Sequence, residues 1–194
     1  WLQTEWPELQ VYLTSVTEQY GTISLNGPNS RKLMQKLNPK YDFSKDNFPH
    51  MSFKNINLCG IECRVMRISF TGELCYEINV PSGYAENLWN ICIEKGEEFN
   101  ITPYGTEAMH VLRAEKGFII VGQETDGSVT PVDLDMDWIV SKKKYDFVGK
   151  RALNRSDTIK KDRKQLVGLK TKDPKKVLEE GAQLVEKITS LPMK

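Results

Sequence analysis

The chain has 194 residues, of which 39% are apolar and 27% are charged, and its formal net charge is +1. This composition is typical of a folded globular protein and excludes a disordered or fibrous chain. No run approaches the roughly 20 apolar residues of a membrane-spanning helix and no secretory leader is visible, so the sequence favours a cytoplasmic protein without a membrane partner.

Short strands dominate the first half of the predicted structure. Runs rich in β-branched and aromatic residues predict strands, and the residues 26–28 (NGP) end one strand and begin a helix. In chain order we predict strands over 9–16 and 19–25, a helix over 28–37, a hairpin of 51–58 with 61–70 across Gly60, and a strand over 75–80.

Helices are predicted in the second half. Residues 82–99 form a helix with Ser82 as its cap, and residues 102–116 form another that starts at Thr102-Pro103 and ends at Gly117. A brief helix over 148–155 and a strand over 165–171 follow. Helices and antiparallel-looking strands without a βαβα alternation indicate the α+β class.

Charge and cysteine patterns exclude two kinds of site. Residues 141–194 carry 16 basic and 7 acidic residues, but apolar positions interrupt them, so we expect a basic face on a folded segment and no nucleic-acid partner. A surface for another subunit or for an anionic ligand is the alternative. The four cysteines lie among apolar residues and neither histidine has ligand spacing, so we expect reduced, buried thiols and no metal.

Motifs for common cofactors are missing from the sequence. It holds no GxGxxG, no GxxxxGK[ST] and no GxSxG, so neither a nucleotide site nor a serine nucleophile is visible. On a strand with a side-chain period of two, Glu77 faces away from Tyr76 and Ile78. Taken alone, that placement equally fits a solvated charge on the wet face of a sheet.

Five short motifs in register resemble the aminomethyltransferase family. This family comprises the glycine-cleavage T-protein and the folate domains of dimethylglycine and sarcosine oxidases. The motifs are residues 26–28 (NGP), 70–77 (FTGELCYE), 112–117 (LRAEKG), 130–138 (TPVDLDMDW) and 146–150 (DFVGK). The resemblance spans nearly the whole chain and is closest to the α subunit of heterotetrameric sarcosine oxidase, at residues 1–7, 141–144 and 162–168.

The resemblance implies four folate-binding residues. Glu77 stands where the family grips the pterin ring of tetrahydrofolate, and Phe70 takes the place of a tyrosine, so the ring face is kept and the hydroxyl lost. Arg113 matches an arginine of the folate cavity, where it stabilises Glu77 or meets an anionic part of the ligand. Trp138 matches a tryptophan near the ligand. The alternatives are core packing for Phe70 and Trp138 and a surface position for Arg113.

The resemblance also implies what lies outside the chain. The catalytic aspartate of the family has no match here, since Asp42 and Asp46 fall in a later loop, so we assign no catalytic residue. FAD, FMN and NAD are expected elsewhere in a parent complex, and the other α-subunit domains and the other subunits are the expected partners. The one-carbon unit would pass to tetrahydrofolate in this part of the complex.

The predicted domain organisation follows the same resemblance. Residues 1–160 form an aminomethyltransferase-type folate-binding domain, with antiparallel sheets and packed helices, whose N-terminal part is missing. Residues 161–194 begin an incomplete C-terminal β-barrel domain. The chain is therefore expected to be an internal fragment that is inactive alone. A glycine-cleavage aminomethyltransferase and a structural relative with an empty folate cavity remain as alternatives.

Overall fold

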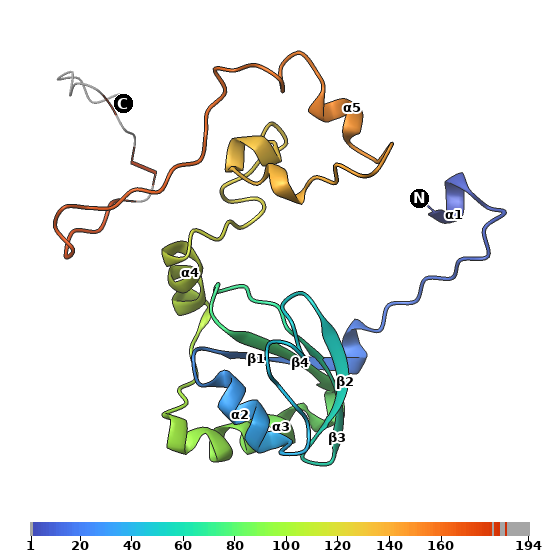
Figure 1. The fold of residues 1–194 in the computed structure, drawn as a ribbon, viewed down its shortest axis with the longest axis vertical. Coiled ribbons are helices and arrows are strands. Elements are labelled where there is room, and N and C mark those ends of the chain that lie inside the picture. The colour runs from blue at the N-terminus through green and yellow to red at the C-terminus, as the bar shows by residue number, and fades with distance from the viewer. Residues whose placement is uncertain (1, 180, 183–184, 186–194) are drawn as a thin grey trace. The chain divides into compact units, whose positions relative to one another are not determined.

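A computed structural model describes residues 2–179, 181, 182 and 185 (Figure 1). The chain divides into two compact units, Trp1–Ile119 and Ile120–Lys194, which we call the first and the second unit.

The first unit contains one four-stranded antiparallel sheet. Its strands have the order β1-β4-β3-β2, which places β4 in the interior of the sheet. The strands are β1 (Tyr20–Asn26), β2 (Phe53–Leu58), β3 (Ile61–Met66) and β4 (Cys75–Pro81). The helices are α1 (Leu2–Glu5), α2 (Ser30–Leu37), α3 (Ala85–Gly96) and α4 (Thr106–Glu115), and 3₁₀ turns lie at η1 (Thr17–Gln19), η2 (Ser82–Tyr84) and η3 (Glu97–Phe99).

One face of the sheet carries the hydrophobic core. Tyr76, Ile78 and Val80 alternate along β4 and are all fully buried on this face. They form one cluster with apolar side chains of α2 and α3, so both helices cover the same face. Burial of each such side chain contributes about 1.5–3 kcal/mol, and this packing confirms the predicted antiparallel sheet with helices.

The hairpin of β2 and β3 follows the turn chemistry of the sequence. Leu58 pairs with Ile61, which leaves Cys59 and Gly60 as the two turn residues. Both have positive φ angles, 51° and 90°. Such a turn matches the right-handed twist of the flanking strands, and glycine adopts it at little cost.

Several predicted elements of the first unit differ from the structure. Residues 9–16 form no strand, and Tyr12 and Leu13 are exposed, because no neighbouring strand among the described residues pairs with them. The helix predicted from Ser82 is divided into η2, α3 and η3, and no side chain caps it. The helix predicted from Thr102 begins only at Thr106, while Gly117 ends it with a positive φ as expected.

The thiols are reduced, but one of them is not buried. No disulfide joins the four cysteines. Cys63, Cys75 and Cys92 lie in the interior, whereas Cys59 in the hairpin turn is exposed, so the prediction of a buried thiol is wrong there. Cys59 is one of the two turn residues, and both its amide and its Sγ donate to the carbonyl of Leu37 at the end of α2, so the thiol lies at this turn and outside the apolar cluster.

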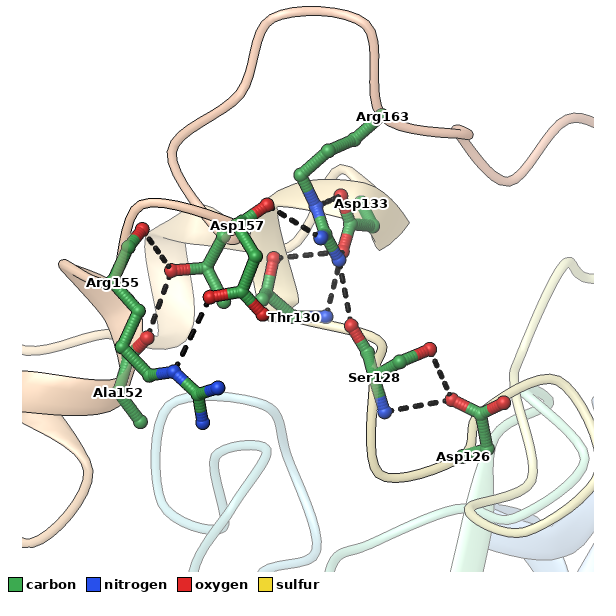
Figure 2. A network of polar contacts seen from close by, with 9 residues as sticks. Asp126, Ser128, Thr130, Asp133, Ala152, Arg155, Asp157 and Arg163 are labelled. Carbon is green, nitrogen blue, oxygen red and sulfur yellow. Dashed lines mark hydrogen bonds and ion pairs between the residues drawn. The ribbon is translucent and has the colours of Figure 1, made fainter.

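The second unit has short elements held together by polar contacts. Its elements are η4 (Pro131–Leu134), η5 (Asp137–Ile139) and α5 (Lys150–Leu153). Thr130 and Asp133 form a capping box at the start of η4. The backbone amide and the hydroxyl of Thr130 both donate to the carboxylate of Asp133. Arg163 donates to the same carboxylate from Nε at 2.8 Å and from Nη2 at 2.5 Å (Figure 2).

This carboxylate joins two separate segments of the second unit. Arg163 also donates to the carbonyls of Ser128 and Asp157 (Figure 2). The amide of Leu166 donates to the carbonyl of Asp133 at 2.8 Å. Hydrogen bonds from Arg163, with those from Thr130, hold the pKa of the Asp133 carboxyl well below its usual range. The Asp133–Arg163 pair is thus the polar centre of the second unit.

The predictions for the C-terminal part of the chain are not confirmed. Residues 165–171 are not a strand in the structure, so that prediction is wrong. The boundary between residues 160 and 161 and the barrel over 161–194 stay predictions, and residues 180, 183–184 and 186–194 of that range lie outside the described residues. Among the described residues, no helix is both long and apolar enough to cross a membrane.

Candidate functional site

The turn between β3 and β4 is anchored to the end of β1. Thr71 is 1% exposed, and its hydroxyl donates to Oδ1 of Asn26 at 3.1 Å. The carbonyl of Leu74 accepts a hydrogen bond from the amide of Gly27 at 2.8 Å. The structure therefore places two motifs of the sequence, residues 26–28 and 70–77, side by side.

Glu77 projects from β4 on the sheet face opposite the core, as the period of two predicts. Its direct neighbours across the strands are Ser24 of β1 and Met66 of β3. The side chain is partly buried, and its carboxylate has no hydrogen bond or ion pair with the described part of the chain. A carboxylate fixed on an interior strand with both oxygens open can accept two parallel donors from a ligand.

A polar cluster includes Ser24, the neighbour of Glu77 on β1. Nδ2 of Asn26 donates to Oγ of Ser24 at 2.9 Å and to the hydroxyl of Tyr104 at 2.5 Å. Oγ of Ser24 lies 3.5 Å from Sγ of Cys75. Burial raises the pKa of the Tyr104 hydroxyl, and the nearby Cys75 and Glu77 raise it further. Sequence reasoning missed Tyr104, since nothing in the local pattern reveals its contact with Asn26.

Arg67 supports the start of β4 from the core side of the sheet. Its Nη1 donates to the carbonyl of Cys75 at 2.9 Å, and its guanidinium lies 5.2 Å from the ring centroid of Tyr76. Its Nε is buried without a hydrogen-bond partner in the described residues. Burial also raises the pKa of the Cys75 thiol to about 11, so this sulfur stays protonated at neutral pH.

The turn that carries Phe70 packs against α4. The rings of Phe70 and His110 meet edge to face at 6.2 Å, and Glu73 forms an ion pair with Lys116 at 2.9 Å. Phe70 is 37% exposed, so its alternative role as a core residue is wrong in this unit. An aromatic face is therefore available next to the turn.

Arg113 and Trp138 occupy different units. Arg113 lies three residues after His110 on α4, is partly buried, and donates from Nη1 to the carbonyl of Phe118 at 3.1 Å. The alternative of a surface arginine on an amphipathic helix therefore stays open, since the side chain is only partly buried. Trp138 lies in η5 of the second unit and is 73% exposed, which rules out core packing within the described residues. The ligand-binding roles of both residues stay predictions.

Each unit contains a cavity. In the first unit a cavity of about 440 Å³ is bordered by Ser24, Asn26 and Tyr104 but not by Glu77. In the second unit a cavity of about 620 Å³ is bordered by Lys144 and Arg155 among others. Since Glu77 lines neither of these cavities, its predicted role as a pterin clamp stays a prediction. No cluster of three metal-ligating side chains exists among the described residues.

Comparison with known proteins assigns the family. Residues 1–144 match the GCVT N-terminal domain, which is about three quarters of the chain. The chain belongs to this family. The family assignment confirms the resemblance to aminomethyltransferases that the five sequence motifs indicated.

Curated relatives agree with this assignment. The chain is 58% identical over 186 residues to "Sarcosine oxidase subunit alpha" of Corynebacterium sp. strain P-1 and 39% identical to the protein of that name from Rhizobium meliloti. These alignments cover 95% of the chain but 19% of each relative. An "Aminomethyltransferase" of Thermoanaerobacter sp. strain X514 is 32% identical over 79% of the chain and 41% of the relative. The chain thus spans about a fifth of the length of the α subunits it matches.

Proposed function

We propose that this chain is the folate-binding part of a sarcosine oxidase α subunit, with Glu77 as the residue that holds the pterin ring. The single observation that carries the proposal is the position of Glu77. Its carboxylate is fixed on the interior strand β4, is partly buried, and has no partner within the described residues. The identity of 58% to an α subunit over almost the whole chain supports the same assignment.

The chemistry of the donor set fits this ligand. The 2-amino group and the N3–H of a pterin are adjacent parallel donors, and a carboxylate accepts both at once. Phe70 offers an aromatic face in the turn before β4, and Arg113 offers a cation on α4. Bound tetrahydrofolate would supply the nitrogen nucleophiles that take up a one-carbon unit. The contribution of this chain is to bind and orient, because no catalytic acid or base of the family is assigned to it.

The proposal includes the reaction of the parent protein. Sarcosine would be demethylated oxidatively to glycine by flavin chemistry elsewhere in the complex. The one-carbon unit, as formaldehyde or an iminium, would then be passed to tetrahydrofolate to give methylene-tetrahydrofolate. FAD, FMN and NAD, together with further subunits, are assigned to the parent and not to this chain.

The test uses the complete α subunit in its assembly. Glu77→Gln retains one acceptor and loses the charge, so we expect tetrahydrofolate affinity to fall by about 1.5–3 kcal/mol, or roughly 10- to 150-fold in Kd. Glu62→Gln is the matched control, because Glu62 lies on the same sheet face near the hairpin turn and is exposed. Calorimetric affinities that are equal in the wild type and both variants would contradict the pterin clamp.

A second function is supported by the aminomethyltransferase relatives. A protein of that kind takes its one-carbon unit from a lipoyl-bound aminomethyl group rather than from an oxidised amine. Supplying the complete protein with sarcosine or with an aminomethyl-lipoyl protein, and measuring the methylene-tetrahydrofolate formed, separates the two. A protein that binds no folate at all would instead be a structural relative with an empty cavity.

A further inference from the structure

The outer edge of β1, the side of Tyr20–Asn26 that faces away from β4, is unprotected. β1 stands at one end of the strand order, so no other strand of the described chain pairs with this edge. Its seven residues (YGTISLN) contain neither a charged residue nor a proline. Exposed edge strands usually carry such residues to prevent pairing with other chains. The opposite edge strand, β2, follows that rule with the exposed Lys54.

A cavity lies directly beside this edge. Four successive residues of β1, from Ile23 to Asn26, line the cavity of about 440 Å³. Trp89, Ile93 and Met109 are among the apolar side chains of its other walls. No Asp, Glu, Lys, Arg or His lines it. The edge therefore combines free backbone groups with a hollow that favours uncharged, apolar side chains.

We propose that the outer edge of β1 is a docking site for an extended peptide strand that places apolar side chains in the adjacent cavity. In this mode of recognition the added strand forms main-chain hydrogen bonds with the edge, and alternate side chains fill the pocket. The uncharged lining of the cavity disfavours a strand with a charged residue at those positions, because an unpaired buried charge is costly.

In the α subunit proposed above, the occupant is a segment of the same polypeptide outside these 194 residues. The α subunits that match the chain are about five times as long, so most of such a polypeptide lies outside these 194 residues. A strand tethered to the same chain also has a high effective concentration at the edge, which favours it over a separate molecule. This occupant rests on the proposed assignment to an α subunit, but not on whether the protein binds folate.

Hydrogen exchange in the complete subunit tests the docked strand directly. In an antiparallel pair only alternate amides of β1 bond to β4, and the others point to the outer edge. We expect both sets of amides between Tyr20 and Asn26 to exchange slowly, by at least a hundredfold relative to unstructured peptide. Rapid exchange of every second amide would overturn the proposal.

A pair of variants on α4 shows whether the cavity takes part. Met109→Lys places a charge in the cavity wall, whereas Val111→Lys places the same charge on an exposed position two residues away. We expect the outer-edge amides to exchange at least tenfold faster in Met109→Lys and unchanged in Val111→Lys. Equal rates in the two variants would overturn the role of the cavity.

Cross-linking identifies the occupant. A photoreactive p-benzoylphenylalanine in place of Thr102, an exposed residue at the cavity, is expected to capture a peptide of the same polypeptide. Capture of a second copy or of a different subunit would overturn the assignment of the occupant. So would the absence of any peptide cross-link, because a docked strand lies within reach of that position.

Discussion

Asp133→Asn tests how the second unit is held together. The carboxylate accepts four hydrogen bonds, two from Thr130 and two from Arg163, and its side chain is only 7% exposed. An asparagine has one acceptor and one donor end. In either orientation its amino group therefore faces at least one N–H donor of Thr130 or Arg163.

The expected magnitude follows from these contacts. A lost hydrogen bond between charged groups costs about 1.5–3 kcal/mol, and breaking a fully buried ion pair costs about 3–5 kcal/mol. Because Arg163 is still 19% exposed, water compensates part of the lost hydrogen bonding. We therefore expect Asp133→Asn to lower the free energy of unfolding of the second unit by about 2–3 kcal/mol. The segments that carry Ser128 and Leu166 would separate more often as a result.

Hydrogen exchange at Leu166 is the appropriate assay, since its amide donates to the carbonyl of Asp133. A change of 2–3 kcal/mol corresponds to roughly 30- to 150-fold faster exchange of that amide. Asp135→Asn is the control, because Asp135 is exposed and has a φ of 57°, a conformation that asparagine also tolerates. Equal exchange at Leu166 in the two variants would refute the reasoning.

The pH dependence gives an independent check. The pKa of Asp133 is lowered in the folded state, so its contribution to stability is complete above the unfolded value of about 3.9 and is lost as the pH falls below it. The difference in the free energy of unfolding between wild type and Asp133→Asn should stay constant from about pH 8 to pH 5 and shrink below about pH 4. A difference that shrinks as the pH rises would contradict the sign of this linkage.

Three further outcomes are expected. Burial raises the pKa of the Cys63 and Cys75 thiols to about 11, so iodoacetamide at pH 8 should modify only Cys59 in the native 194-residue chain. Mass spectrometry of the alkylated peptides checks this prediction, and rapid labelling of Cys75 would contradict it. Arg163→Lys keeps the charge but loses the two-pronged donation, so the exchange of Leu166 should lie between wild type and Asp133→Asn. Gly72→Ala should destabilise the first unit by about 1–2 kcal/mol in urea unfolding, because the φ of Gly72 is +76° and an added Cβ would lie 2.7 Å from the Lys116 side chain. Gly127→Ala is the control, because an added Cβ there meets open space.

Local patterns predicted the elements that position Glu77. The period of two along residues 75–80 was enough to place Glu77 opposite Tyr76 and Ile78, and the structure has the same alternation. The turn at Gly60 and the helix after residues 26–28 were also visible, because turn and cap chemistry depends on neighbouring residues. In each case the information needed lies within a few positions of the chain.

The failures have a common physical cause, which is contact between distant segments. Residues 9–16 have the composition of a strand but no described neighbour to pair with, and composition alone supplies no hydrogen-bond partner. The segment before Thr106 looks like a capped helix start, yet Tyr104 instead reaches Asn26 across 78 positions of sequence. The Asp133–Arg163 pair spans 30 positions and was likewise invisible.

The charge partners of the acidic residues near the turn explain why Glu77 is the better candidate for binding a ligand. Glu73 lies on the same turn, but its charge is already compensated by Lys116. Glu77 has no such compensation from the described residues, although it sits between Ser24 and Met66 on β4, a strand that is paired on both sides. Desolvating an uncompensated carboxylate costs free energy, so a fold that retains one on an interior strand gains from an external donor. Under the proposed function, a ligand with two adjacent N–H groups would supply such a donor, and its binding would then stabilise this strand.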